Sequence, residues 1–408
     1  MRHALFATTI AALWSCGPEP QVTEPPDAGL HATSAPQYQV EILTASLGGT
    51  ISRGSGINNR GWIGGFSFEP GNATLHAALW RGGSITDLGT LGGPNSRVPW
   101  PGVSDAGLVV GISHTGQLDS LDEAWSCEAG GFLPATNPRQ ICRGFVWRDG
   151  VIHELPTLGG THGFATGVNS RGQVVGWAET PVRDPTCTDV QVLQFRAVMW
   201  EPKKGTMRQL PPYPGDSASA AVGINERGQV VGISGECDQS VGRFSARRGV
   251  LWDHGTITRI PDLGGKSWHT PQDINERGDV AGFSNPPGED PEGDFIAHAF
   301  LWIHGSPTAL DLGTLDDDAL SQGQALNNRR QVVGVSFGGS SGSRAFLWRD
   351  GVLMDLNDLA GPGFGPGETY VLLSARDINE AGQITGDVRE VATGLRFAFV
   401  AWPTRVTR

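Results

Sequence analysis

The chain has 408 residues, of which 59 are glycine and 27 are proline, and its 42 acidic against 30 basic residues give a net charge of −12. An acidic chain repels phosphate backbones, so we expect no nucleic-acid partner. The chain is longer than a typical domain with a single hydrophobic core, but its length is normal for a repeat fold. Its glycines recur at fixed places in the sequence, which indicates turns.

The first residues are typical of a bacterial export signal. Residues 4–13 form an apolar run that is too short to span a bilayer. Leu13-Trp14-Ser15-Cys16 follows and resembles a lipobox, which predicts cleavage before Cys16 and a lipid on its sulfur; a plain signal peptide with a chance cysteine is the alternative. We therefore expect a signal peptide at 1–15, a Pro-rich acidic tether at 16–37, and a protein anchored to the cell envelope that faces the periplasm or the exterior. It would meet the membrane only through this lipid.

One sequence motif then recurs seven times along the chain. It begins with an apolar residue and Asn before a Gly turn and a Val-Val-Gly run, as at Ile224-Asn225, and it ends on a Trp that precedes a second Gly turn. The repeated tryptophans are Trp80, Trp147, Trp200, Trp252, Trp302, Trp348 and Trp402. This period is typical of four-stranded propeller blades, so we predict an all-β, seven-bladed β-propeller with these tryptophans in its core. The expected blades lie near 47–88, 91–155, 158–210, 211–263, 264–312, 315–356 and 359–403, with a tail at 404–408.

The two ends of the repeat complement each other. The seventh copy stops after Trp402 without a fourth strand, whereas residues 38–43 form a strand that has no blade of its own. We predict that 38–43 completes the last blade and closes the ring, since an open solenoid would need capping repeats. Arg330 stands where a turn glycine is expected, at a cost of about 1 kcal/mol that allows a differently bent hairpin.

Two sequence motifs resemble those of a known family. His298-Ala299-Phe300-Leu301-Trp302 and the run from Asp87 to Gly93 are similar to the HAF-repeat family of extracellular bacterial proteins. The resemblance covers residues 38–403 and implies export and repetition, but it implies no catalytic residue. Val103-Ser104 in the second copy departs from the apolar-Asn pattern.

Four more cysteines follow the lipobox cysteine. An even number in an exported protein predicts two disulfides, which we assign as Cys127–Cys142 and Cys187–Cys237. None of them has the close spacing of a zinc or redox site, so we expect no metal and no cofactor. The alternative is calcium in one acidic loop with Glu289, Asp290, Glu292 and Asp294, but these residues lack the Asp-x-Asp-x-Asp-Gly order, which favours a solvated loop.

Topology sorts the connections onto two faces. The turns between first and second and between third and fourth strands are short, whereas the loops between second and third strands are long in copies two to five. These loops share a face with the linkers between blades, so we predict a site there to which blades 2 to 5 contribute most. The candidate ligand-binding residues are Arg53, Arg97, Trp100, His162, Phe164, Trp268, His269, Asp317, Glu368 and Tyr370. They could instead pack the linkers or face water. Trp100 and Trp268 lie outside the repeat consensus, so we expect them to offer flat apolar faces to a ligand.

The favoured hypothesis is a monomeric, non-catalytic protein that binds a glycan or a protein through this face. A propeller hydrolase or lyase acting on polysaccharide is the alternative, and it needs two carboxylates about 5 to 9.5 Å apart in the central funnel. A purely structural envelope protein is the third hypothesis. Residues 338–342 match a Gly-x-Ser-x-Gly nucleophile elbow by letter only, because no strand-to-helix context surrounds them.

Overall fold

The computed structural model describes residues 37–123, 127, 139–187, 191–237, 242, 244–288 and 294–404. The predicted signal peptide, Cys16 and almost all of the tether and tail lie outside these residues. Within them, no helix is long and apolar enough to cross a membrane.

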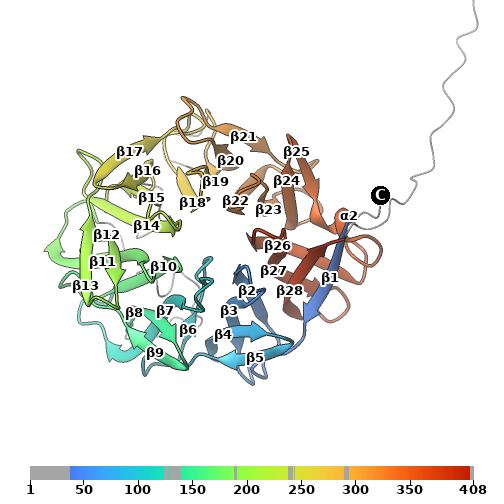
Figure 1. Cartoon of the computed structure of the whole chain (residues 1–408), viewed down its shortest axis with the longest axis horizontal. Coiled ribbons are helices and arrows are strands. Elements are labelled where there is room, and N and C mark those ends of the chain that lie inside the picture. Colours follow the sequence, from blue (N-terminus) through green and yellow to red (C-terminus); the bar gives the residue numbers. More distant parts are fainter. Residues whose placement is uncertain are drawn as a thin grey trace, which may run out of the picture. The chain divides into compact units, whose positions relative to one another are not determined.

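Seven four-stranded antiparallel sheets stand around a central axis, which confirms the predicted propeller (Figure 1). Blade 1 consists of β2 (Ser52–Ile57), β3 (Ile63–Phe68), β4 (Leu75–Arg81) and β5 (Ser84–Asp87). Blade 2 consists of β6 (Ser96–Arg97), β7 (Val109–Leu118), β8 (Gln140–Arg148) and β9 (Val151–Glu154). Blade 3 consists of β10 (Gly163–Val168), β11 (Val174–Arg183), β12 (Leu193–Glu201) and β13 (Thr206–Leu210). Blade 4 consists of β14 (Ala218–Ile224), β15 (Val230–Gly235), β16 (Arg248–Asp253) and β17 (Thr256–Ile260).

The remaining blades follow the same order, with the first strand innermost. Blade 5 consists of β18 (Thr270–Ile274), β19 (Val280–Ser284), β20 (His298–Trp302) and β21 (Leu310–Gly313). Blade 6 consists of β22 (Leu320–Leu326), β23 (Val332–Phe337), β24 (Arg344–Arg349) and β25 (Val352–Asp355), and a short helix, α2 (Leu356–Ala360), follows it. Blade 7 consists of β26 (Tyr370–Ile378), β27 (Ile384–Glu390), β28 (Arg396–Pro403) and β1 (Tyr38–Leu43).

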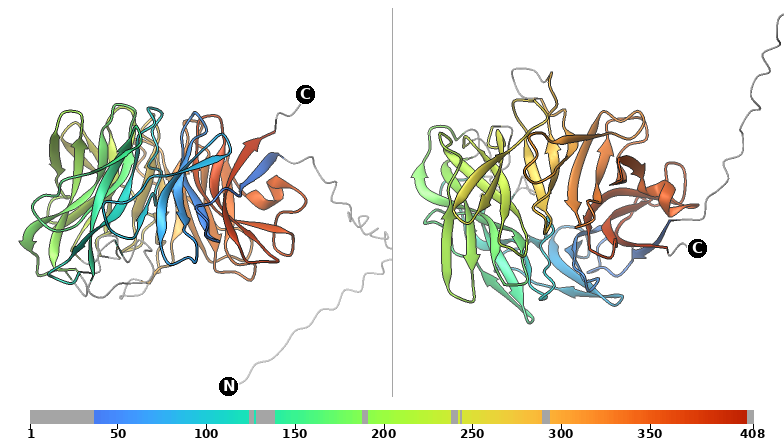
Figure 2. Two further views of the ribbon diagram at one scale, coloured as in Figure 1. Left: turned by 90° about the horizontal axis from the view of Figure 1, so that it is seen from below. Right: turned by 45° about the horizontal axis from the view of Figure 1, so that its top comes forward.

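Blade 7 joins the two ends of the ring. β1 pairs antiparallel with β28, from Tyr38 opposite Pro403 to Leu43 opposite Ala398, as the sequence predicted (Figure 2). Tyr38 is only 2% exposed and packs in one apolar cluster with Leu359 and Phe399. The N-terminal strand therefore removes an open sheet edge from the last blade.

The repeated Asn shapes the hairpin between the first two strands. In blade 4, Asn225 Oδ1 accepts the backbone N–H groups of Arg227 and Gln229, at 3.1 and 3.0 Å. Gly228 then takes the left-handed conformation, with φ of 83°. Arg330 takes the same conformation, with φ of 59°, and its N–H donates to the Asn327 carbonyl like the glycines elsewhere. The differently bent hairpin allowed for Arg330 is therefore wrong, and its guanidinium instead pairs with Asp279 at 2.8 Å.

The same Asn ties neighbouring blades together. Its side-chain amide donates to the backbone carbonyl of the next blade's Asn, as from Asn225 to Asn275 at 2.9 Å. The bond from Asn379 to Asn58, at 3.0 Å, closes the circle. Ser104, which replaces the Asn in blade 2, accepts such a bond through its carbonyl but has no side-chain amide to pass it on. The repeat thus encodes contacts between blades as well as turns.

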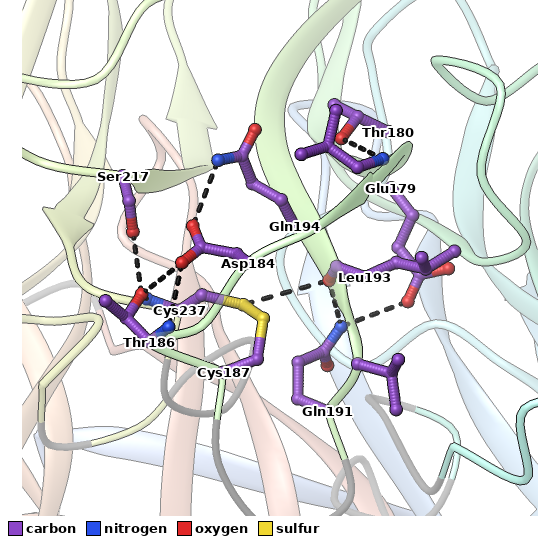
Figure 3. Close-up of a disulfide and its surroundings, with 12 residues drawn as sticks. Glu179, Thr180, Asp184, Thr186, Cys187, Gln191, Leu193, Gln194, Ser217 and Cys237 are labelled. Atoms are coloured by element: carbon purple, nitrogen blue, oxygen red, sulfur yellow. Dashed lines mark hydrogen bonds between the residues drawn. A yellow bond between two sulfur atoms is a disulfide. The ribbon is translucent and has the colours of Figure 1, made fainter.

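Both predicted disulfides are present. Cys127 joins Cys142 within the second-to-third-strand loop of blade 2, and Cys187 joins Cys237 between the equivalent loops of blades 3 and 4. Around the second disulfide, Asp184 accepts hydrogen bonds from Thr186 and Gln194, and the Cys237 N–H donates to Thr186 (Figure 3). The loops on this face are therefore cross-linked to one another.

Candidate functional site

An aromatic cluster occupies one side of the central axis. Trp100 follows β6 of blade 2, and its indole N–H donates to Gln272 Oε1 of β18 in blade 5, at 2.7 Å. Its ring lies 5.1 Å from that of Phe164 and 6.0 Å from that of Trp177. Trp100 thus occupies a packing position within the channel. Its predicted contact with a ligand stays a prediction.

Three arginines from consecutive blades lie beside this aromatic cluster, which also includes Phe66. The guanidinium groups of Arg53 (β2) and Arg97 (β6) lie over the Phe66 ring, 4.9 and 4.6 Å from its centroid. Arg376 (β26) donates to Ser374 Oγ at 2.9 Å and to Gln324 Oε1 at 3.3 Å.

Burial lowers the pKa of all three guanidinium groups, and repulsion by neighbouring arginines adds to the shift for Arg53 and Arg97. Burial, followed by the charge of Arg376, lowers the pKa of Arg97 to about 9. Burial and the charges of Arg376 and Arg97 lower the pKa of Arg53 well below its usual value. Asp387 opposes these shifts for Arg53 and Arg376. This part of the channel therefore holds more positive than negative charge.

A polar pocket of about 250 Å³ opens beside this arginine cluster, on the face that carries the long loops. Arg376 and Asp387 belong to it, and Arg389 and Arg396 extend it outward along β27 and β28. Its opposite wall is the loop between β23 and β24, with Ser341 and Ser343. That loop contains the Gly-x-Ser-x-Gly letters, and it joins two strands rather than a strand and a helix. We call this cavity the arginine pocket.

Two residues of the arginine pocket form an unfavourable pair. Arg389 and Arg396 stand directly opposite each other across β27 and β28. Like charges at such a position destabilise a sheet. Among the described residues, neither arginine forms an ion pair, and Asp387 is the only carboxylate in the pocket. The pocket is therefore suited to an anion, which would offset the repulsion.

Two carboxylates lie deeper along the axis. Asp377 accepts the N–H groups of Ile57 and Ile378, both at 2.7 Å, and Asp273 accepts those of Leu326 and Ile274. Each therefore ties its own blade to the next strand along the ring. Burial, with the charge of Asp273, raises the pKa of Asp377 to about 8, and burial raises that of Asp273 to about 6. Both oxygens of each carboxylate accept a backbone N–H group, so the role of these two residues is to join neighbouring blades.

The other predicted ligand-binding residues are spread over the loop face. His162 is fully buried and accepts the Cys142 N–H at 3.1 Å. His269 is buried beside Phe300, with its Nε2 3.1 Å from the Ile260 carbonyl. These two histidines occupy internal positions that no ligand on the face could reach without a change in packing.

The remaining candidates lie nearer the surface. The Trp268 ring is half-buried and meets the Phe295 ring edge-on, at 5.2 Å. Asp317 is exposed and accepts two hydrogen bonds from Ser340, which brace the β23–β24 loop. Glu368 is exposed, and Tyr370 packs against Phe364. The structure thus brings Arg53, Arg97, Trp100 and Phe164 together at the axis, whereas the other candidates stay apart from them.

The calcium alternative falls mostly outside the described residues. Glu289, Asp290 and Glu292 are not described, and Asp294 is exposed. The alternative therefore stays a prediction.

Sequence reasoning missed the residues of the arginine pocket. Arg376, Arg389 and Arg396 lie in the strands of blade 7 rather than in linkers or long loops. The sequence did contain a pattern that marks the charged residues near the axis. Arg53 and Arg97 each follow a Ser at the start of an inner strand. Asp273 and Asp377 stand where the other copies of the repeat have Gly or Ala.

Comparison with known proteins supports the fold. No family model matches this chain, and no curated protein matches it either. Among solved structures, it is similar to the Pyrococcus horikoshii acylaminoacyl peptidase, with a TM-score of 0.50 and 11% identity over 86% of this chain and 51% of that one. It is also similar to the β-propeller domain of the Trilobed protease from Pyrococcus furiosus, with a TM-score of 0.49 and 10% identity over 88% and 97% of the two chains. The chain therefore spans about half the length of the peptidase, and at these identities the likeness concerns the fold alone.

Proposed function

We propose that this chain is a non-catalytic binding protein that recognises an acidic glycan through the arginine pocket on its loop-bearing face. One observation carries the proposal: Arg376, Arg389 and Arg396 converge on one polar pocket that contains the single carboxylate of Asp387. A guanidinium binds a carboxylate or sulfate through paired, charge-assisted hydrogen bonds. A protein ligand that presents Asp or Glu is the alternative within the same chemistry.

Binding fits the channel better than hydrolysis does. A glycosidase needs one carboxyl group that can donate a proton and a second that can attack or activate water. Asp273 and Asp377 lie on the inner strands β18 and β26, and each is held by two backbone N–H groups. The arginine pocket itself has only Asp387, whose carboxylate accepts the Ser374 hydroxyl.

The cellular setting belongs to the same proposal. We propose that the chain is exported, carries a lipid on Cys16, faces the periplasm or the exterior as a monomer, and belongs with the HAF-repeat proteins it resembles. Two disulfides support an oxidising compartment. A ligand at the cell envelope would then approach the loop face from the medium.

A glycan array tests this function. The full chain should bind carboxylated or sulfated glycans, and the Arg389→Ala/Arg396→Ala variant should lose that binding by roughly 10-fold or more, since a hydrogen bond to a charged group contributes about 1.5–3 kcal/mol. Arg183→Ala is the matched control, because Arg183 is an exposed arginine at the end of β11 in blade 3. Loss of binding in Arg183→Ala alone would instead place the site in the sector of blades 2 to 5.

A further inference from the structure

The loop layer of blades 2 and 3 buries three carboxylates next to one another. Asp119, Glu123 and Glu179 are 5%, 1% and 0% exposed. Gln191, which is 3% exposed, lies between two of them, with its Nε2 3.1 Å from Glu179 Oε1 and 3.5 Å from Glu123 Oε1. Figure 3 shows Gln191 directed toward Glu179 beside the Cys187–Cys237 disulfide. These residues form what we call the acidic cluster.

Backbone amides satisfy only part of the acidic cluster. Glu123 Oε1 accepts the N–H groups of Val192 and Leu193, at 2.6 and 2.8 Å. Asp119 and Glu179 each accept two backbone N–H groups as well. Glu123 Oε2 and Gln191 Oε1, however, are buried and have no hydrogen-bond partner among the described residues. Leaving a buried oxygen unpaired is costly, so these two oxygens indicate a missing partner.

Two basic side chains act on the cluster without neutralising it: His162 favours the ionised form of all three carboxylates, and Arg143 attracts Glu179 without an ion pair. Within the described part of the chain, no lysine or arginine forms an ion pair with Asp119, Glu123 or Glu179. His162 is the nearest titratable group, with its Nε2 3.6 Å from Asp119 Oδ2. Burial raises the pKa of Glu179 to about 7 and also raises that of Glu123. When all three carboxylates are ionised, His162 and Arg143 leave the cluster with an excess of negative charge, which favours a bound cation.

The atoms available as metal ligands indicate which cation the site would bind. His162 Nδ1 accepts the Cys142 N–H at 3.1 Å, so a neutral His162 carries its proton on Nε2 and offers no lone pair toward Asp119. The remaining donors are all oxygens, which suit calcium rather than zinc. Ligand atoms of Asp119 and Glu123 lie within 4.8 Å of each other. This fits two oxygens bound to one calcium at about 2.3–2.6 Å each.

We propose that Asp119, Glu123 and Glu179 form a calcium site that ties the long loops of blades 2 and 3 to each other, with Gln191 holding Glu179 in place through its Nε2, which also donates to the Leu193 carbonyl. Asp119 follows β7 and Glu179 lies within β11, so one ion would link two blades. The site differs from the acidic loop that includes Glu292 in blade 5, and from the arginine pocket.

Calorimetry of the full chain tests the site. After removal of metal with a chelator, calcium chloride should give a saturable binding heat. It should also raise the unfolding temperature by roughly 3–4 °C when calcium stands about 100-fold above its Kd. Glu123→Gln keeps the acceptor for Val192 and Leu193 but replaces Oε2 by an amide nitrogen. That variant should fold and show neither effect.

Two controls separate this site from other acidic groups. Asp350→Asn changes an exposed acidic residue in the turn before β25, and the calcium response should persist. Asp290→Asn/Glu292→Gln should also keep the response. The proposal is overturned if the wild-type chain shows no calcium effect, if Glu123→Gln retains the full effect, or if zinc rather than calcium stabilises the chain.

Discussion

Replacing Tyr38 by alanine should weaken the closure of the ring. Tyr38 opens β1, is 2% exposed and lies opposite Pro403, and β1 has β28 as its only strand partner in the sheet. Truncating a buried aromatic side chain to alanine costs about 3–5 kcal/mol. With an unfolding entropy of about 2.1 cal/mol/K per residue, a cost of about 3 kcal/mol lowers the unfolding temperature by roughly 4 °C in a ring of this size.

Differential scanning calorimetry of the full chain measures that shift. Glu41→Ala is the matched control, because Glu41 lies in the same strand with its side chain exposed, and it should unfold close to the wild-type temperature. Tyr38→Phe keeps the aromatic side chain, so its unfolding temperature should fall much less than that of Tyr38→Ala. Equal unfolding temperatures for Tyr38→Ala and Glu41→Ala would refute the idea that β1 holds the ring closed.

Three further predictions follow from the contacts between and within blades. Asn225→Ala removes the bond to Asn275, two turn bonds and the bond to the Gln229 side chain, so chemical denaturation should show a loss of about 4 kcal/mol at about 1 kcal/mol for each bond. An unchanged midpoint would contradict the role of Asn225 in joining the blades. The Asp311 hydrogen bond raises the pKa of His298 above its usual value, so the contribution of this pair to stability is complete below about pH 6.5 and is lost as pH rises through the raised value. His298→Asn should therefore flatten the decline in unfolding temperature that the wild-type chain shows as pH rises above about 6.5; an unchanged decline would contradict this assignment. Cys187→Ser/Cys237→Ser removes a disulfide whose cysteines are 50 residues apart, and it should lower the free energy of unfolding by about 4 kcal/mol. Cys127→Ser/Cys142→Ser removes one with a separation of 15 and should lower it by about 3 kcal/mol. Equal losses in urea unfolding would argue against loop length as the cause.

The repeat made the fold predictable because its residues have the same local task in nearly every copy. Asn225 and Gly228 show why: one caps the hairpin and the other takes the left-handed conformation. The missing last strand likewise predicted the pairing of β1 with β28. Cysteine pairing followed from loops that topology places side by side.

The arginine pocket was not predictable in the same way. Its residues come from adjacent strands of blade 7, where a period of two alone does not show which side chains meet. Trp100 illustrates the converse: it stands outside the consensus, yet it reaches Gln272 from the connection between β6 and β7, which is longer than the corresponding connection in the other blades. Glu123 and Gln191 lie in loops without periodicity, so only coordinates bring them together.

The most direct test of the proposed function compares two ligands that differ only in charge. An acidic oligosaccharide that binds on the array is measured by isothermal titration calorimetry beside the same oligosaccharide with its carboxyl groups reduced to alcohols. Recognition by Arg376, Arg389 and Arg396 predicts that reduction lowers affinity by roughly 10-fold or more, since each charge-assisted hydrogen bond contributes about 1.5–3 kcal/mol. Equal affinity for the acidic and the reduced glycan would contradict an anion-binding pocket.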